Sequence, residues 1–274
     1  NNIAYVINRL GKERTAEGAA IVGIAEVENR QVLQDLINTK ELKAKQYKIV
    51  HYDSPDRRGI DVALLYNPRL FKVTSSKPYP YRLPGNPDFK TRDQLLVSGT
   101  FAGEALHVIV NHWPSRYGVK SSELREVAAS ITKHIADSLY KDNPACHIII
   151  MGDLNDNADN HSTRLILKAK KQQKDVKPGG LFNTSWKLYE KGIGSARYKG
   201  KWDFFDQIII SHSLLGKGSS GLRFLKAEVY KPDFLIQQKG KFKGYPLRSF
   251  SGTVFMNGYS DHLPALIYMI KGGN

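Results

Sequence analysis

Side chains that can bind a metal ion or move a proton stand at the ends of five strand-like, apolar runs of this sequence. These runs cover residues 20–27, 105–113, 147–154, 206–211 and 263–270, and the residues at their ends are Glu26, Asn111, His112, Asp153, Asn155, Asp206, Asp261 and His262. Each one alone has a structural explanation, such as a turn in which Asp153 and Asn155 cap their own backbone. Because strands that end at one edge of a sheet commonly form sites, five coincident ends favour a shared functional site.

The donor types at these positions favour a hard divalent cation. Carboxylate and amide oxygens suit Mg²⁺, which they hold at about 2.1 Å, and Mn²⁺ or Ca²⁺ are alternatives. The sequence has a single cysteine, Cys146, and no His-x-x-x-His pair, which argues against zinc. Histidines beside such a cation point to a phosphate ester as substrate, since imidazole can donate hydrogen bonds or transfer protons there.

Composition limits the classes of partner. The 274 residues include 41 Lys or Arg and 26 Asp or Glu, which gives a formal net charge of +15. This excess favours nucleic acid, phosphorylated small molecules or an anionic membrane surface, although a solvated lysine-rich surface has the same signature. With 41% hydrophobic and 24% charged residues the chain is typical of a folded globular protein, and its apolar runs are too short to span a bilayer.

The elements that must position these residues are mostly strands. Apolar periodicity predicts helices over residues 1–10, 31–38, 121–140 and 162–169, and strands over 20–27, 47–52, 61–66, 71–78, 94–101, 105–113, 147–154, 206–211, 224–231 and 263–270. Residues 170–202 are rich in Lys, Gly and Gln and are expected to form loops. No repeat or linker divides the chain, which favours one α+β domain with sheets inside and helices outside.

Six motifs in this order resemble the endonuclease/exonuclease/phosphatase superfamily over residues 20–270. They are Gly-Ile-Ala-Glu-Val (23–27), Arg-Gly-Ile-Asp-Val-Ala-Leu-Leu-Tyr (58–66), Val-Asn-His-Trp-Pro-Ser-Arg (110–116), Gly-Asp-Leu-Asn-Asp (152–156), Phe-Asp-Gln-Ile-Ile (205–209) and Ser-Asp-His-Leu-Pro (260–264). Gly-Asp-x-Asn followed by a terminal Ser-Asp-His is specific in that order. The resemblance implies a four-layer α/β/β/α sandwich of two packed mixed sheets, with the site at one edge.

The resemblance also implies a role for each residue of the set. Metal binding would fall to Glu26 and Asp261, and positioning and activation of the attacking water to Asp153 and Asn155. The scissile phosphate would be contacted by His262 and His112, with Asp206 orienting His262. Further substrate contacts are expected from Asn111, Arg116, Tyr198, Lys199 and Trp202.

One expected part of the family pattern does not match. The family opens with a strand that ends in an asparagine near the metal, and nothing before Glu26 fits it. We therefore expect residues 1–274 to form a single domain that lacks its first strand. That strand would precede residue 1, together with any export signal.

The combined interpretation is a monomeric, metal-dependent phosphodiester hydrolase, with an endonuclease acting on nucleic acid by in-line water attack as the leading reading. The alternatives are a phosphatase or sphingomyelinase-like esterase, or a catalytically silent nucleic-acid-binding module. Basic and aromatic residues interleave at 197–202, and lysines cluster at 168–174 and 239–243, which fits contact with a phosphate backbone. Action at a membrane would require an exposed apolar hairpin, and none is obvious in the sequence.

Asp61 interrupts an apolar strand, where an unpaired buried carboxylate would be costly. A pair between Asp61 and His112 would fix the tautomer of the imidazole and favour its protonated form. The alternative, of equal weight, is that Asp61 pairs with Arg57 or Arg58 in the preceding turn.

Overall fold

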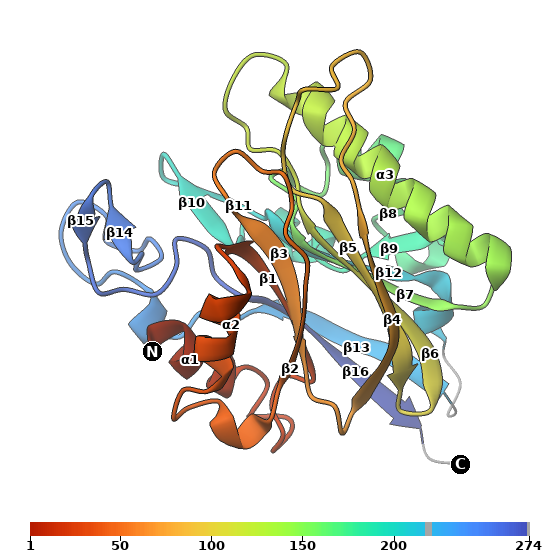
Figure 1. The fold of residues 1–274 in the computed structure, drawn as a ribbon, viewed down its shortest axis with the longest axis horizontal. Helices are drawn as coiled ribbons and strands as arrows, with labels where there is room; N and C mark the ends of the chain where they lie inside the picture. The colour runs from red at the N-terminus through yellow and green to blue at the C-terminus, as the bar shows by residue number, and fades with distance from the viewer. Residues whose placement is uncertain (217–220, 273–274) are drawn as a thin grey trace.

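The computed structural model describes residues 1–216 and 221–272, and a seven-stranded mixed sheet forms its centre (Figure 1). The strands follow the order β4-β5-β6-β7-β12-β9-β8. Their bounds are β4 (Phe71–Tyr79), β5 (Gln94–Phe101), β6 (Glu104–His112), β7 (His147–Asp153), β12 (Asp206–Ser211), β9 (Leu181–Asn183) and β8 (Ala169–Lys170).

A second layer of strands packs against this sheet. It consists of the three-stranded sheet β1 (Ile21–Val27), β3 (Asp61–Tyr66) and β2 (Lys48–His51), in the order β1-β3-β2, and of the pair β13 (Gly221–Val229) and β16 (Ala265–Gly272). Side chains alternate along β3: Val62 and Leu64 pack against the large sheet, whereas Ala63 and Leu65 pack against helices.

Helices cover both outer faces (Figure 1). Helix α3 (Ser121–Asp142) packs on the large sheet, and α1 (Asn2–Arg9) and α2 (Arg30–Ile37) pack on the small one. This arrangement confirms the expected four-layer α/β/β/α sandwich. The shorter elements are η1 (Lys43–Lys45), η2 (Ser162–Ile166), η3 (Gln173–Asp175), α4 (Trp186–Glu190), β10 (Ala196–Tyr198), β11 (Lys201–Asp203), η4 (His212–Leu215), η5 (Asp233–Leu235), β14 (Phe250–Ser251) and β15 (Val254–Phe255).

Two regions differ from the sequence-based expectation. Residues 170–202 are not only loops, because they contribute two strands to the large sheet, the helix α4 and the hairpin β10–β11. The helix expected over 162–169 is a single five-residue turn followed by β8. Both errors have the same physical reason: elements of two to five residues are too short to show a hydrophobic period.

The topology places three predicted site residues side by side. Strands β6 and β7 are parallel, joined by α3 as a crossover helix, and His112 at the end of β6 is the register partner of Asp153 at the end of β7. Strand β12 runs antiparallel to β7, so its first residue, Asp206, lies opposite Asp153. Gly152 makes this approach feasible, because a Cβ there would lie 2.0 Å from the carbonyl oxygen of Asn111, and its φ of +130° suits only glycine.

A cavity of about 400 Å³ lies between the two layers of strands. Its walls include residues 19–23 of β1 and the loop before it, residues 264–269 of β16 and the loop before it, and Ile149 and Met151 of β7. In the described part of the chain, β1 pairs only with β3 and β16 only with β13. The two strands therefore each leave one edge unpaired on either side of an apolar space.

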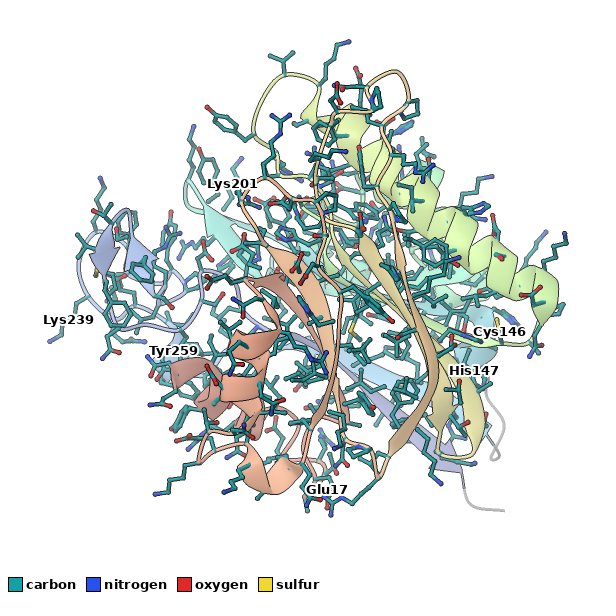
Figure 2. The ribbon with its side chains drawn as sticks, viewed as in Figure 1. Glu17, Cys146, His147, Lys201, Lys239 and Tyr259 are labelled. Carbon is teal, nitrogen blue, oxygen red and sulfur yellow. The ribbon has the colours of Figure 1, made fainter. Side chains whose placement is uncertain are left out.

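Glu104 connects the two layers of strands, because it contacts both Leu222 and His147, a residue that lies far from Lys201 in Figure 2. Its carboxylate lies 2.8 Å from His147 Nε2 and accepts a hydrogen bond of 2.9 Å from the backbone N–H of Leu222. Burial acts to raise the pKa of Glu104, but these two contacts outweigh it and the net pKa is lowered. A lowered carboxyl pKa means that the folded state gains stability from the ionised form.

We expect Glu104→Gln to lower the free energy of unfolding by about 1 kcal/mol at pH 7. The loss should be complete above the unfolded pKa of about 4.3 and should shrink as the pH falls through the lower folded value. Urea unfolding of both proteins at pH 7 and pH 3.5 measures this. Glu190→Gln is the control, because Glu190 forms an exposed pair with Lys171 and should change stability little. An equal deficit at both pH values would mean that shape, not charge, carries the effect.

Candidate active site

His262 and Asp206 form an ion pair at the edge where β7 and β12 meet. His262 Nδ1 lies 2.8 Å from Asp206 Oδ2. Burial lowers the pKa of His262, but Asp206 in hydrogen-bond contact, with Asp153 and Asp261 nearby, outweighs it and raises the pKa to about 10. The ring is therefore an imidazolium at neutral pH, with Nδ1 held by Asp206 and Nε2 left to donate to an anion.

Asp153 is the buried carboxylate of the site. Its Oδ1 accepts a hydrogen bond of 2.8 Å from the backbone N–H of Asn155, and its Oδ2 lies 3.3 Å from Asn155 Nδ2. Burial raises the pKa of Asp153 to about 7, and the charges of Asp206 and Glu26 act in the same direction. A carboxylate with this pKa can accept a proton from water near neutral pH.

Asn155 holds an uncommon backbone conformation. Its φ is +50°, in the left-handed region, and its amide Nδ2 donates to the carbonyl oxygen of Trp113 at 2.9 Å. Asparagine tolerates this conformation better than most residues. The tight turn from Asp153 to Asn155 therefore brings carboxylate and amide to the same point beside the end of β6.

His112 lies against Asp153 and is neutral. Its Nε2 is 3.6 Å from Asp153 Oδ2. Burial lowers the pKa of His112 well below its usual value, and the positive charges of Arg92, Arg58 and His262 add to this effect. Within the described residues its buried Nδ1 has no hydrogen-bond partner. The site thus contains one neutral and one charged imidazole on either side of Asp153.

The expected pair between His112 and Asp61 is wrong, and so is the alternative with Arg57 or Arg58. Asp61 Oδ2 lies 3.0 Å from His51 Nε2. The other oxygen accepts hydrogen bonds from Ser54 N–H at 2.8 Å and from Ser54 Oγ at 2.6 Å. The physical reason is register: His51 on the neighbouring strand β2 lies opposite Ala63, two residues from Asp61 on β3, and this pairing could not be inferred from motif order.

His51, Asp53 and Asp61 also form the one group in the described part of the chain whose donor atoms lie within 4.8 Å of one another, as an acidic metal site requires. The donors of this group are largely occupied. His51 and Asp61 bond each other, and only Asp53, with its side chain 92% exposed, is free of close partners. These contacts favour a structural anchor between β2 and β3 over an ion site.

Glu26 and Asp261 supply exposed carboxylates beside the buried ones. Glu26 occupies a β-bulge with φ of +60°, which turns its side chain out of the β1 ladder. Glu26 Oε1 lies 3.6 Å from Arg58, and Asp261 Oδ2 lies 3.6 Å from Arg248. Neither carboxylate is committed to a close hydrogen bond by these arginines. The oxygen donors of these carboxylates are of the type that a divalent cation prefers, but among the described residues they do not bring three donor atoms within 4.8 Å of one another.

Sequence reasoning missed a buried arginine at the site. Arg92 donates to the carbonyl oxygen of Trp113 at 2.7 Å and pairs with Asp56 at 3.0 Å. The same carbonyl accepts from Asn155, so Arg92 fixes the backbone next to His112. The only available signal was its place between two strands in Thr-Arg-Asp, which by itself indicates nothing.

Two of the expected substrate contacts lie elsewhere or are occupied. Asn111 is fully buried and its amide oxygen accepts from Trp113 Nε1 and Thr132, on the helix side of the sheet. Adjacent residues of a strand face opposite sides, so Asn111 points away when His112 points to the site. Arg116 reaches the site, where it donates to the carbonyl oxygen of Asn155 at 2.8 Å and lies over the ring of Phe205. We interpret Arg116 as a positioning residue.

The three other expected contacts lie on the hairpin β10–β11 (Figure 1). Tyr198 and Lys199 are at its exposed tip, whereas Trp202 is partly buried beneath Arg197 and Lys231. The hairpin joins the site directly, because Ala196 bridges to His262 and the Leu263 N–H donates to Ser195 O at 2.7 Å.

In the described part of the chain, no helix is long and apolar enough to cross a membrane.

Comparison with solved structures shows the same fold in proteins of low sequence identity. An endonuclease/exonuclease/phosphatase from Bacteroides vulgatus has a TM-score of 0.62 at 15% identity, covering 98% of this chain and 90% of that one. The Bacteroides thetaiotaomicron mannosyl-6-phosphatase has a TM-score of 0.60 at 15% identity, with the same coverage. D. rerio TDP2 in complex with a single-strand DNA product has a TM-score of 0.59 at 13% identity, covering 99% and 94%.

A search of curated proteins finds no match. A family model described as endonuclease/exonuclease/phosphatase matches residues 1–271, which is nearly the entire chain. This match agrees with the motif order, with the four-layer sandwich and with the carboxylates and imidazoles gathered at one edge of its sheets. The chain belongs to the endonuclease/exonuclease/phosphatase family.

Proposed function

We propose that the protein is a metal-dependent phosphodiesterase that cleaves nucleic acid by attack of water in line with the leaving oxygen. The observation that carries this proposal is the pairing of a proton acceptor with a fixed positive charge. Asp153, with its pKa raised to about 7, lies beside the imidazolium of His262, which Asp206 holds at 2.8 Å. Hydrolysis of a phosphodiester needs both a group that takes a proton from water and a group that stabilises charge on the phosphate.

The residues divide these tasks between them. Asp153 accepts the proton of the attacking water, and Asn155 orients that water through its amide. His262 donates from Nε2 to a non-bridging phosphate oxygen, and its charge persists because Asp206 holds Nδ1. His112, neutral and 3.6 Å from Asp153, supplies a second hydrogen bond in the same place.

Glu26 and Asp261 are the residues that would hold the cation, and Mg²⁺ is the ion that their oxygen donors suit, with Mn²⁺ or Ca²⁺ as alternatives. When bound, the ion polarises a phosphoryl oxygen and offsets the negative charge that develops there. The carboxylates fit this purpose because both are exposed and, among the described residues, the one ion-pair partner of each is an arginine at 3.6 Å.

Nucleic acid is favoured as the substrate by charge and by the hairpin above the site. The net charge is +15, and Tyr198 and Lys199 stand exposed beside the edge that holds His262. The D. rerio relative was solved with single-strand DNA product, which supports the same class. The mannosyl-6-phosphatase of the same fold supports the alternative, a phosphatase of small phosphate esters.

An activity panel tests the proposal. We expect hydrolysis of single-stranded DNA, RNA or plasmid DNA with Mg²⁺, complete loss with EDTA, and recovery when Mg²⁺ is restored. Inositol phosphates, sugar phosphates and sphingomyelin serve as the competing substrates. Cleavage of sugar phosphates or sphingomyelin alone would favour the esterase alternative, and no hydrolysis of any substrate would favour a binding module.

Salt dependence separates a backbone-binding enzyme from a small-substrate phosphatase. If the positive surface contacts a nucleic-acid backbone, the logarithm of the binding constant should fall with the logarithm of salt concentration by about 0.9 per neutralised phosphate for duplex DNA and about 0.7 for single strands. Fluorescence anisotropy in EDTA measures this without cleavage. A binding constant that does not change with salt concentration would support the alternative of a small-substrate phosphatase.

We also propose that the domain is completed by one additional strand of the same polypeptide, placed between β1 and β16. Within residues 1–216 and 221–272, each of these strands has an unpaired edge, and both strands line the apolar cavity of about 400 Å³. Helix α1 begins close to the loop that carries Asp261, because Asn2 Nδ2 donates to the carbonyl oxygen of Gly258 at 2.8 Å, three residues before Asp261. A strand that ends near the candidate active site could therefore continue directly into α1. A strand running towards the site, followed by α1 and then β1, is an ordinary parallel β-α-β unit.

Hydrogen exchange tests this strand without reference to activity. In a polypeptide extended by its natural upstream residues, the amides of β1 and β16 that face the cavity should become protected, whereas those of β3 should not change. Proteolytic cleavage just ahead of α1 should leave the upstream fragment bound in size-exclusion chromatography. Unchanged exchange, or release of the fragment without loss of structure, would refute the proposal.

A further inference from the structure

An arm of the fold between β13 and the Asp261–His262 loop is unusually rich in exposed apolar and basic side chains. This arm, residues 231–260, contains five basic residues and one acidic residue, Asp233. Three lysines, Lys239, Lys241 and Lys243, lie in one loop, and Lys239 extends from the outer edge of the arm (Figure 2). The arm therefore presents a positive surface next to the candidate active site.

The same arm exposes aromatic rings. Among the described residues, the exposed phenylalanines are Phe242 (46%), Phe250 (55%) and Phe255 (62%), and all three lie in this arm. Phe250 and Phe255 are register partners on β14 and β15, with ring centroids 5.2 Å apart. Cross-strand partners project from the same face of a hairpin, so the two rings form one solvent-facing aromatic surface.

Side-chain and backbone contacts connect this aromatic surface to the edge that holds the candidate active site. Arg248, two residues before Phe250, lies 3.6 Å from Asp261. On the other side, Arg197 of the hairpin β10–β11 donates to the carbonyl oxygen of Gly244 at 2.9 Å, and the Gly200 N–H donates to Tyr245 Oη at 2.7 Å. The arm and the hairpin β10–β11 thus contact each other, and each is linked to the Asp261–His262 loop.

We infer that this arm is a stacking platform for an unpaired strand of nucleic acid, with Phe250 and Phe255 against the bases and Lys239, Lys241 and Lys243 along the backbone. The inference rests on the proposed function and specifies its substrate as single-stranded. Proteins that bind single-stranded nucleic acid without sequence preference stack its bases on exposed aromatic rings and contact its backbone with nearby positive charges.

The geometry favours a nucleic-acid strand over a lipid surface. A hairpin that enters a membrane needs apolar residues at its turn, whereas here Ser251 pairs with Val254 and the turn between them is formed by Gly252 and Thr253. The rings lie on one side of the hairpin and not at its end. Paired bases in a duplex present no free faces to such a surface, so the preference should be for unpaired bases.

Binding of a fluorescein-labelled dT12 and of the same length of duplex, measured by anisotropy in EDTA, tests the platform. We expect tighter binding of dT12 than of duplex, and a loss of about tenfold for each stacked base in Phe250→Ala/Phe255→Ala. Phe250→Leu/Phe255→Leu keeps the apolar area without the rings and should lose nearly as much. Leu225→Ala removes an exposed apolar side chain from β13 and should change nothing.

The outcomes separate the platform from the proposed function. Equal binding of wild type and both phenylalanine variants would overturn the platform, even if the enzyme cleaves DNA in Mg²⁺. Loss of dT12 binding in the variants would support it, even if no substrate of the activity panel is hydrolysed. If vesicles with 30% phosphatidylserine bind, and the Leu variant binds them as well as wild type, the arm is a membrane surface and the inference is wrong.

Discussion

Asp153→Asn should abolish hydrolysis while making the metal-free protein more stable. The carboxylate is buried, it lies among Asp206 and Glu26, and its pKa is raised to about 7 by burial and by those neighbours. An amide cannot accept the proton of the attacking water, so we expect kcat/KM to fall by at least about 10³-fold. The same change removes mutual repulsion between carboxylates and should raise the free energy of unfolding by about 1 kcal/mol, measured by urea unfolding in EDTA.

Asp156→Asn is the matched control, three residues further along the same loop. Its carboxylate is also buried, but it lies 2.8 Å from Arg125 Nε and accepts from Ser162 Oγ. Removing one partner of a buried ion pair costs stability, by about 3 kcal/mol. Two aspartates three residues apart should therefore change stability in opposite directions. A loss of stability in Asp153→Asn would mean that its carboxylate supports the fold instead of the reaction.

The sequence predicts the parts of this molecule that depend on strong periodic signals. The strand over residues 206–211 and the helix beginning at Ser121 lie where they were expected, because their apolar patterns are long and bounded by turn residues. The order of the motifs was enough to predict the sandwich and the shared edge of its sheets. The ends of the apolar runs mark the ends of buried strands. The polar residues at those ends could therefore be assigned to one shared site without knowledge of their contacts.

Contacts between side chains could not be predicted in the same way. The partner of Asp61 depends on which residue of β2 lies opposite β3, and a change of register by one residue exchanges the two faces of a strand. The same alternation places Asn111 in the core and its neighbour His112 at the site. Arg92 and the aromatic arm were missed because no period or motif marks them, and only the folded chain brings them beside His112 and Asp261.

Asp206→Asn should lower kcat/KM by about 10²-fold in a protein that still folds. Asp206 Oδ2 holds His262 Nδ1 at 2.8 Å and is the main reason that the pKa of this ring is raised despite burial. An asparagine can still occupy the space, but it supplies no charge to favour the imidazolium and can present an N–H where an acceptor is needed. We expect the loss mainly in kcat, because the ring acts on the phosphate as charge develops.

A second aspartate–histidine pair in the same protein serves as a control for the expected effect of Asp206→Asn. Asp61 and His51 lie 3.0 Å apart, nearly the distance of the Asp206–His262 pair, but Asp61 also accepts two hydrogen bonds from Ser54 and both side chains are buried. Asp61→Asn should lower the free energy of unfolding by about 1–3 kcal/mol and leave kcat/KM of the folded enzyme unchanged. Kinetics and urea unfolding of both variants compare the two pairs. If both lose activity equally, proximity to an imidazole would not distinguish a catalytic pair from a structural one, and Asp206 would have no separate role in orienting His262.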